Sequence, residues 1–244
     1  MSKDSEDPPK VKATVAEAEA EAKTKTKTGQ PDTQDDKMMQ YIAGILRLLA
    51  SIFFICAAVF LHPDVHFERN PFDKVGAFFM TGFFLFGAAL AVELYMKRNK
   101  DPMIVGSISV TLFAVVLLFI AGILTLSDVI DDIETLNAFA GVFITGSLIL
   151  FTCQVVELFA YSGREDESRN MMMISMVIAI VGTFFFFLGA VFSIEDVLFP
   201  DDFEDLNDLQ DLFYKNFERR AALFITGSVL YLVHAIAYLM DSFM

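Results

Sequence analysis

The sequence predicts an all-helical, polytopic membrane protein with six transmembrane helices, arranged as three repeated helical hairpins. Hydrophobic residues make up 55% of the 244-residue chain, more than a soluble domain of ordinary composition contains. Six stretches carry at most one charge each. Each is about 20 residues long, the length that spans the hydrocarbon core of a bilayer as a helix. A six-residue pattern recurs in every second stretch, which indicates three copies of one unit.

The first 36 residues are predicted to be a disordered tail. They consist largely of Lys, Glu, Asp, Ala and Thr, so they cannot bury enough apolar surface to offset the entropy of ordering. The three hairpins are assigned to residues 37–100, 101–168 and 169–244, the last of which carries an acidic insertion.

Each hairpin contains two apolar segments long enough to span a membrane, allowing for some tilt. The six expected spans are Tyr41 to Leu61, Gly76 to Met96, Met103 to Leu126, Leu136 to Ala160, Met171 to Ser193 and Ala221 to Met240.

Charges in the links predict an orientation. The links 97–102 and 162–170 are basic, whereas 127–135 and 194–220 are acidic. The positive-inside rule therefore predicts that the tail, the basic links and the C-terminus are cytoplasmic. The net charge of −14 argues against nucleic acid as a partner. The expected partners are the lipid bilayer and a membrane protein or a second copy of the chain.

The repeated pattern lies in the second helix of each hairpin, at 77–82, 141–146 and 222–227. Thr81 and Thr145 are 64 residues apart, as are the matching positions of the first helices. The third copy has 13 extra residues between its two helices.

Helix packing is the favoured interpretation of the pattern. A small residue four positions before Thr, and Gly directly after it, would let a neighbouring backbone approach, while Thr returns its hydroxyl to its own helix. The alternative is that three Thr hydroxyls converge on a pseudo-threefold axis and line a pore. The positions concerned are Ala77, Thr81, Gly82, Gly141, Thr145, Gly146, Ala222, Thr226 and Gly227.

Two copies of the pattern read Phe-Ile-Thr-Gly-Ser, at 143–147 and 224–228. This element, preceded by an apolar helix and a short loop, resembles the signature of the YrhK-like family of small membrane domains. The resemblance covers each hairpin, hence about residues 42–240, although the first copy has Phe83 where the others have Ser. It implies a membrane-embedded helical hairpin without an established activity, and it transfers no catalytic residue.

Four ionisable residues fall inside the predicted spans, namely Arg47, Glu93, Glu157 and His234. Such residues are costly in a bilayer and are therefore candidates for function. Arg47 and Glu93 lie at similar depths, so we expect them to pair or to snorkel. Glu157 occupies the position that corresponds to Glu93, where the third copy has Tyr238.

A glutamate near a helix C-terminus opposes the helix dipole, so these glutamates should have a cationic partner such as Arg98 or Arg164. His234 is the deepest of the four. We expect a neutral imidazole bonded across helices; the alternative is a proton relay that includes Glu157.

No catalytic motif, cofactor site or metal centre is predicted. His62 and His66, with Asp64 and Glu68, have a spacing compatible with zinc, but Pro63 disfavours a helix there. Residues 200–217 place apolar side chains at three- and four-residue steps, which predicts an amphipathic helix on the outer interface.

The sequence thus favours a non-enzymatic integral membrane module that acts by packing with lipid or protein. The alternative is a small-solute or ion transporter with a site around the three Thr and His234. A polar cavity near the midplane distinguishes the second from a dry core of Phe, Gly and Ala.

Overall fold

In the computed structural model the chain is helical over nearly all of the residues described, which are 34–62, 71–98, 102–126, 133–162, 169–194, 206–241 and 243. Six helices lie within these ranges, and each is long and apolar enough to cross a membrane. The fold class predicted from the sequence is confirmed. The helices are α2 (Gln34–Phe60), α3 (Pro71–Lys97), α4 (Pro102–Leu124), α5 (Ile133–Ser162), α6 (Arg169–Val191) and α8 (Leu206–Asp241).

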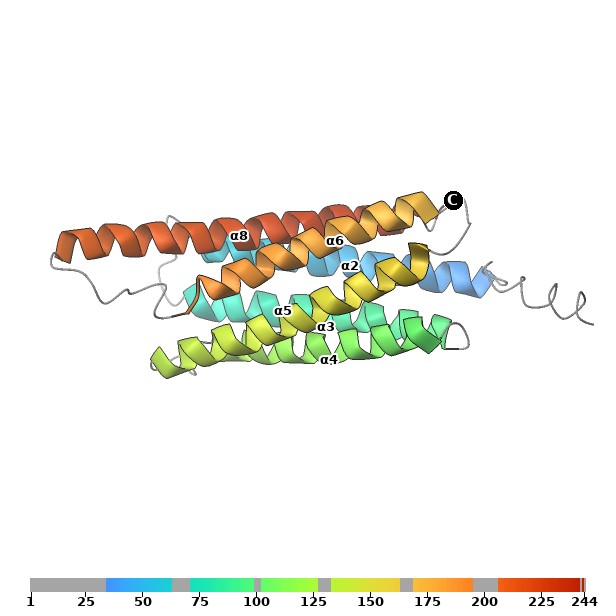
Figure 1. Ribbon diagram of the computed structural model, residues 1–244, viewed down its shortest axis with the longest axis horizontal. Coiled ribbons are helices and arrows are strands. Elements are labelled where there is room, and N and C mark those ends of the chain that lie inside the picture. Colours follow the sequence, from blue (N-terminus) through green and yellow to red (C-terminus); the bar gives the residue numbers. More distant parts are fainter. Residues whose placement is uncertain are drawn as a thin grey trace, which may run out of the picture.

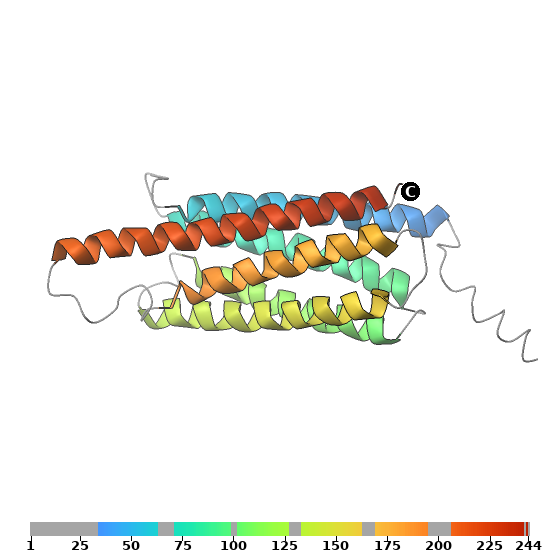
Figure 2. The ribbon, with the colours of Figure 1, turned by 45° about the horizontal axis from the view of Figure 1, so that its top comes forward.

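The six helices form a closed ring. Each packs against its neighbours in chain order, and α2 packs against α8. Figure 1 and a second view in Figure 2 show the helices running side by side along one long axis. Because the number of crossings is even, α2 begins and α8 ends at the same end of the bundle, which we call the terminal end.

All six helices begin before the expected spans, and α2 and α8 do so by the largest margins. α2 starts at Gln34, within the segment assigned to the tail, and its first turn carries Asp35 and Asp36. Carboxylates in this position interact favourably with the positive end of the helix dipole, which explains why the helix extends past the apolar residues. The rest of the predicted tail lies outside the described residues.

α8 is a single helix of 36 residues. At 1.5 Å per residue it is about 54 Å long, well beyond the ~30 Å of a hydrocarbon core. Its first part coincides with the segment that was expected to lie on the outer interface. That segment instead continues in line with the span, and it extends past the other helices at the end opposite the termini (Figure 1). Residues 200–205 of the predicted amphipathic helix lie outside the described residues.

Aromatic side chains fill the centre of the ring toward the end opposite the termini. Phe79, Phe143 and Phe224 come from α3, α5 and α8, and their ring centroids are 5.3 to 5.9 Å apart in all three pairs. These spacings fall in the range of favourable edge-to-face contacts. All three are at most 1% exposed, and further buried rings surround them, namely Phe54, Phe83, Phe86, Phe186 and Tyr231.

The glycines of the repeated pattern lie where two helices of one hairpin come closest. A Cβ on Gly82 would be 2.5 Å from the ring of Phe54, and one on Gly227 would be 2.9 Å from the carbonyl oxygen of Gly182. A Cβ on Gly146 would likewise be 2.9 Å from Leu118. These three glycines leave no room for a side chain between the two helices of each hairpin.

The other pattern positions face outward, whereas the alternative interpretation of the sequence placed the three Thr hydroxyls at the centre. Thr81, Thr145 and Thr226 are exposed on the outside of the ring, and each donates to the carbonyl four residues earlier at 2.8 Å. The small residues that receive these bonds are exposed too. Residues four apart share a helix face, whereas the next residue is rotated by about 100°. The inward face of the pattern therefore holds Gly and Phe, and none of these three Thr hydroxyls lines the centre. The outward small residues are Ala77, Gly141 and Ala222.

Candidate functional site

The candidate site is a cluster of ionisable side chains in the terminal half of the ring. Arg47 of α2 and Glu93 of α3 form an ion pair, with Nη2 of Arg47 2.6 Å from Oε2 of Glu93. Both residues are more than nine-tenths buried. The structure therefore brings together the two residues that their depth in the sequence had paired.

Glu93 is held by two further groups. The hydroxyl of Tyr238 donates to its other carboxylate oxygen, and Nζ of Lys97 lies 3.9 Å from that oxygen, one turn along α3. The guanidinium of Arg47 also stacks over the Tyr238 ring, 4.3 Å from its centroid. Both oxygens of Glu93 are thus engaged. Arg47 was expected to pair with Glu93, and Arg98 or Arg164 was expected as a cation near the glutamates. In the structure the cations beside Glu93 are Arg47 and Lys97. Arg98 instead lies over the ring of Tyr95, and Arg164 is outside the described residues.

Hydrogen bonds define the tautomer of His234. Nε2 of His234 is 3.0 Å from Nη1 of Arg47, and a guanidinium can only donate. Nε2 must therefore accept, so the ring proton resides on Nδ1. Nδ1 lies 3.0 Å from the carbonyl oxygen and 2.8 Å from Oγ of Ser175, which accept this proton. This is the neutral imidazole bonded across helices that the sequence favoured.

The same serine-to-backbone contact occurs in two hairpins. Oγ of Ser175 donates to the carbonyl of His234 at 3.3 Å, and Oγ of Ser107 donates to the carbonyl of Cys153 at 3.2 Å. Both bonds join the first helix of a hairpin to its second helix. Cys153 and His234 occupy corresponding positions, so the two hairpins present different side chains from the same packing arrangement.

A second polar group crosses three helices. Thr183 of α6 donates to Oε1 of Gln154 on α5 at 2.8 Å, and Nε2 of Gln154 donates to the hydroxyl of Tyr231 on α8 at 2.9 Å. The hydroxyls of Thr183 and Tyr231 are 2.6 Å apart. If Tyr231 donates to Thr183, every group donates once and accepts once. This closed network satisfies its own polar atoms in the membrane interior.

A cavity of about 40 Å³ lies between these groups. One water-sized sphere occupies roughly 10–15 Å³, so the cavity holds about three. All six helices contribute to its wall, and polar or ionisable residues come from five of them. These are Arg47, Glu93, Lys97, Thr111, Gln154, Glu157, Tyr161, His234 and Tyr238.

Two buried atoms at this wall lack a hydrogen-bond partner, and one carboxylate lacks an ion pair, among the described residues. Nε of Arg47 and Oγ1 of Thr111 are buried and have no hydrogen-bond partner among the described residues. Glu157 is partly buried and forms no ion pair with a described residue, in contrast to Glu93. Such groups are the ones that a bound ligand or water would satisfy.

The possible zinc site receives no support from the part of the chain that the structure describes. His62 follows the end of α2, whereas His66, Asp64 and Glu68 are outside the described residues. Within the described ranges, no three His, Cys, Asp or Glu residues are placed to hold a metal ion.

Sequence reasoning missed several members of the cluster. Thr111 corresponds to Arg47 by the 64-residue offset, so the repeat itself points to this cavity position. Lys97 was assigned to a basic link, although it is the last residue of α3. Ser175 and Thr183 carried no signal, because a hydroxyl in an apolar helix ordinarily bonds its own backbone.

The fold and this site define a class of protein, namely an α-helical integral membrane protein with a charged cluster inside the ring of its spans. No protein-family model matches the chain, and neither a curated protein nor a solved structure is similar to it.

Proposed function

We propose that this protein binds a small polar solute or ion in the cavity at the centre of its ring and exchanges it with the solution at the terminal end. The observation that carries this proposal is the convergence of ionisable and polar groups from five helices on a cavity of about 40 Å³. The proposed activity is binding and movement without a covalent step, so it is not enzymatic.

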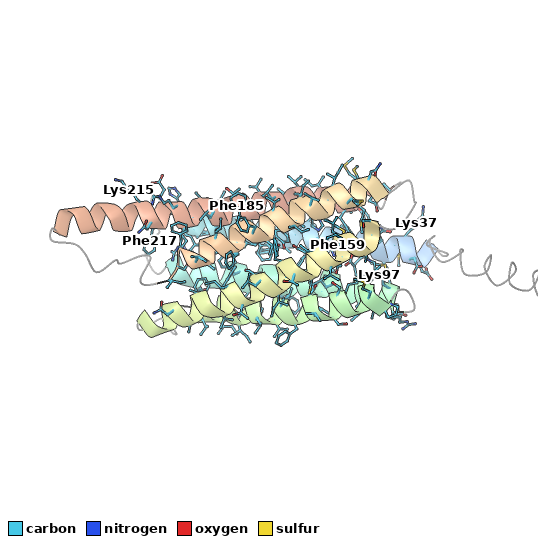
Figure 3. All side chains as sticks on the ribbon, in the orientation of Figure 1. Lys37, Lys97, Phe159, Phe185, Lys215 and Phe217 are labelled. Carbon is cyan, nitrogen blue, oxygen red and sulfur yellow. The ribbon has the colours of Figure 1, made fainter. Side chains whose placement is uncertain are left out.

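The free-energy cost of placing charged side chains inside a bilayer supports a functional role for this cluster. Charged side chains inside a bilayer are rare, and they generally mark ion or substrate pathways. A module that acted only through packing would be at least as stable with apolar residues at these positions, because a buried ion pair seldom repays its desolvation. Lys97 and Tyr161 lie near the terminal ends of α3 and α5, so the cavity wall reaches toward that end. Figure 3 shows Lys97 and Lys37 at this end, far from Lys215 and Phe217.

The non-enzymatic packing module remains the second candidate. The dry aromatic core in the other half of the ring favours it. So do the large apolar side chains exposed on the outside, such as Phe84 and Phe159, which suit contact with lipid, another membrane protein or a second copy of the chain.

We also infer that the three hairpins are copies of one unit of the YrhK-like type. Supporting this are the repeated contacts at Gly82, Gly146 and Gly227 and the matched bonds of Ser107 and Ser175. In this proposal the terminal end faces the cytoplasm, because the described residues Lys37, Lys97, Arg98 and Arg169 lie on that side.

Thiol accessibility separates the two candidates. Thr111→Cys places a thiol at the cavity wall, and Thr145→Cys places one on the outer face, both in a chain with Cys56→Ala and Cys153→Ala. The probe is Ag⁺, which is small enough for the cavity, applied to the protein in liposomes. We expect Ag⁺ to block later alkylation at position 111 and to leave position 145 unaffected. If Ag⁺ blocked alkylation at neither position, the proposed function would be overturned in favour of the packing module.

A further inference from the structure

We propose that the solute is a small monovalent anion taken up together with one proton, and that the proton binds Glu157. This inference rests on the proposed function, and it names the substrate class of the same cavity. The inference follows from the charged residues of the cavity wall, from the ion pairs among them, and from the volume of the cavity.

The four ionised side chains at the cavity are two cations and two carboxylates. Arg47 and Lys97 both lie against Glu93, whose second oxygen accepts from Tyr238. Protonating Glu93 would therefore break an ion pair. Glu157 has no ion pair with a described residue, so it can take up a proton without disrupting the cluster.

The other groups around Glu157 do not compete for this proton. The charged groups that act on it are Glu93, Lys97 and Arg47, from α3 and α2. From α8 the cavity receives Tyr238 and the neutral His234, whose two ring nitrogens are both engaged. α4 contributes the hydroxyl of Thr111 to the cavity wall and the hydroxyl of Ser107, which hydrogen-bonds Glu157, and α6 contributes only apolar residues to the wall. α5 itself places the amide of Gln154 and the hydroxyl of Tyr161 at the cavity wall, and the thiol of Cys153 lies near Glu157.

Charge balance then couples the proton to an anion. With Glu157 ionised, the cavity wall is neutral. With Glu157 protonated it carries one net positive charge, which is costly in the interior of a membrane. A monovalent anion in the cavity restores neutrality. Each ligand thereby favours binding of the other, and by linkage the coupling is reciprocal.

The donors and the available space agree with this class of ligand. Nε of Arg47 and Oγ1 of Thr111 are the buried atoms of the cavity-lining residues that lack a partner among the described residues, and both can donate to an anion. A cavity of about 40 Å³ admits a halide or a similarly small anion and excludes metabolites of ordinary size. Binding is noncovalent: the only bond formed is the O–H bond of the Glu157 carboxylic acid.

The test uses the full chain in phosphatidylcholine liposomes, with chloride as the anion and a pH-sensitive dye in the lumen. Potassium at equal concentration on both sides, with valinomycin, holds the voltage at zero. We expect an inward chloride gradient to acidify the lumen, relative to gluconate. We also expect the chloride concentration for half-maximal uptake to fall about tenfold per unit decrease in pH, over the range in which Glu157 titrates.

Glu157→Gln removes the proton site while keeping the shape of the side chain. In this variant we expect chloride to bind without proton movement and its uptake to lose the dependence on pH. Glu218→Gln makes the same change at an exposed position of α8 outside the cavity, and it should behave like the unaltered protein.

The outcomes separate this inference from the proposed function. The inference would be overturned if a gradient of Na⁺ or K⁺, instead of chloride, drove proton movement. It would also be overturned if chloride uptake by the unaltered protein did not depend on pH. The proposed function would survive that result if Ag⁺ still reached Thr111→Cys. An inaccessible position 111 together with no chloride-driven acidification would overturn both.

Discussion

Arg47 and His234 are 187 residues apart in the chain, yet Nη1 of one and Nε2 of the other are 3.0 Å apart inside the ring. This bond joins α2 to α8, the first and last described helices, at the contact that closes the ring. Arg47 meets Glu93 through its other terminal nitrogen. One guanidinium thus connects the first hairpin internally and connects it to the third.

The tautomer of His234 follows from this bond. We predict that ¹⁵N spectra of the histidine-labelled protein show His234 with its proton on Nδ1 and with Nε2 unprotonated. Arg47→Met removes the donor to Nε2 and should shift the Nε2 resonance, whereas Lys37→Met, at the exposed start of α2, should not. A proton on Nε2 in the unaltered protein would contradict the assignment.

The ion pair of Arg47 and Glu93 predicts a non-additive effect on stability. Arg47→Met removes the closer of the two cations that lie against the buried Glu93 carboxylate and leaves only Lys97, at 3.9 Å, so the free energy of unfolding should fall by about 3–5 kcal/mol. The double variant Arg47→Met with Glu93→Leu should recover most of this loss, because neither charge then remains. Titration with sodium dodecyl sulfate in mixed micelles measures both values. Additive losses in the double variant would show that the two residues do not act as a pair.

The repeated glycines predict a sharp contrast between adjacent residues. Gly227→Ala places a methyl group 2.9 Å from the carbonyl oxygen of Gly182, so the helices must shift, at a cost of about 1–3 kcal/mol. Thr226→Ala changes an outward-facing side chain and should stay within about 0.5 kcal/mol. Thermal unfolding in detergent compares the two variants. If they were equally stable, α6 and α8 would not approach as closely as described.

The aromatic centre predicts that the loss of stability on replacing a phenylalanine depends on whether its ring is buried. Phe143→Ala removes a ring that is 1% exposed and leaves a cavity, which should cost about 3–5 kcal/mol. Phe159→Ala, on the same helix, removes a ring that is 69% exposed and should have little effect. Their unfolding temperatures in one detergent provide the comparison. A similar loss at both positions would mean that the outer face is packed in the purified protein.

Much of the fold follows from local sequence pattern. Six apolar segments predicted six spans because length and hydropathy alone determine whether a helix suits a bilayer. The pairing of Arg47 with Glu93 was also predictable, since depth can be counted along two helices that share a loop. A hydropathy pattern shows where the apolar part of a helix lies, and it does not show how far polar residues continue the helix beyond that part. The starts of α2 at Gln34 and α8 at Leu206 were therefore missed.

The inner and outer faces of each span were harder to predict. In a soluble protein, apolar residues mark the inside, but in a membrane both faces are apolar. The pattern around Thr81 therefore allowed the hydroxyls to be placed at the centre, where the structure has Phe79 and its two counterparts. The network of Gln154, Thr183 and Tyr231 depends on three helices and has no local signature.

All three hairpins run in the same direction, so the two ends of the ring differ in chemistry. Transporters built from inverted repeats can open to either side by exchanging the conformations of two mirrored halves. The described helices have no mirrored half, because the cavity with its ion pair lies toward one end of the ring and the central aromatic rings lie toward the other. A ligand that crossed the whole membrane would have to part the rings of Phe79, Phe143 and Phe224, which makes passage inherently asymmetric.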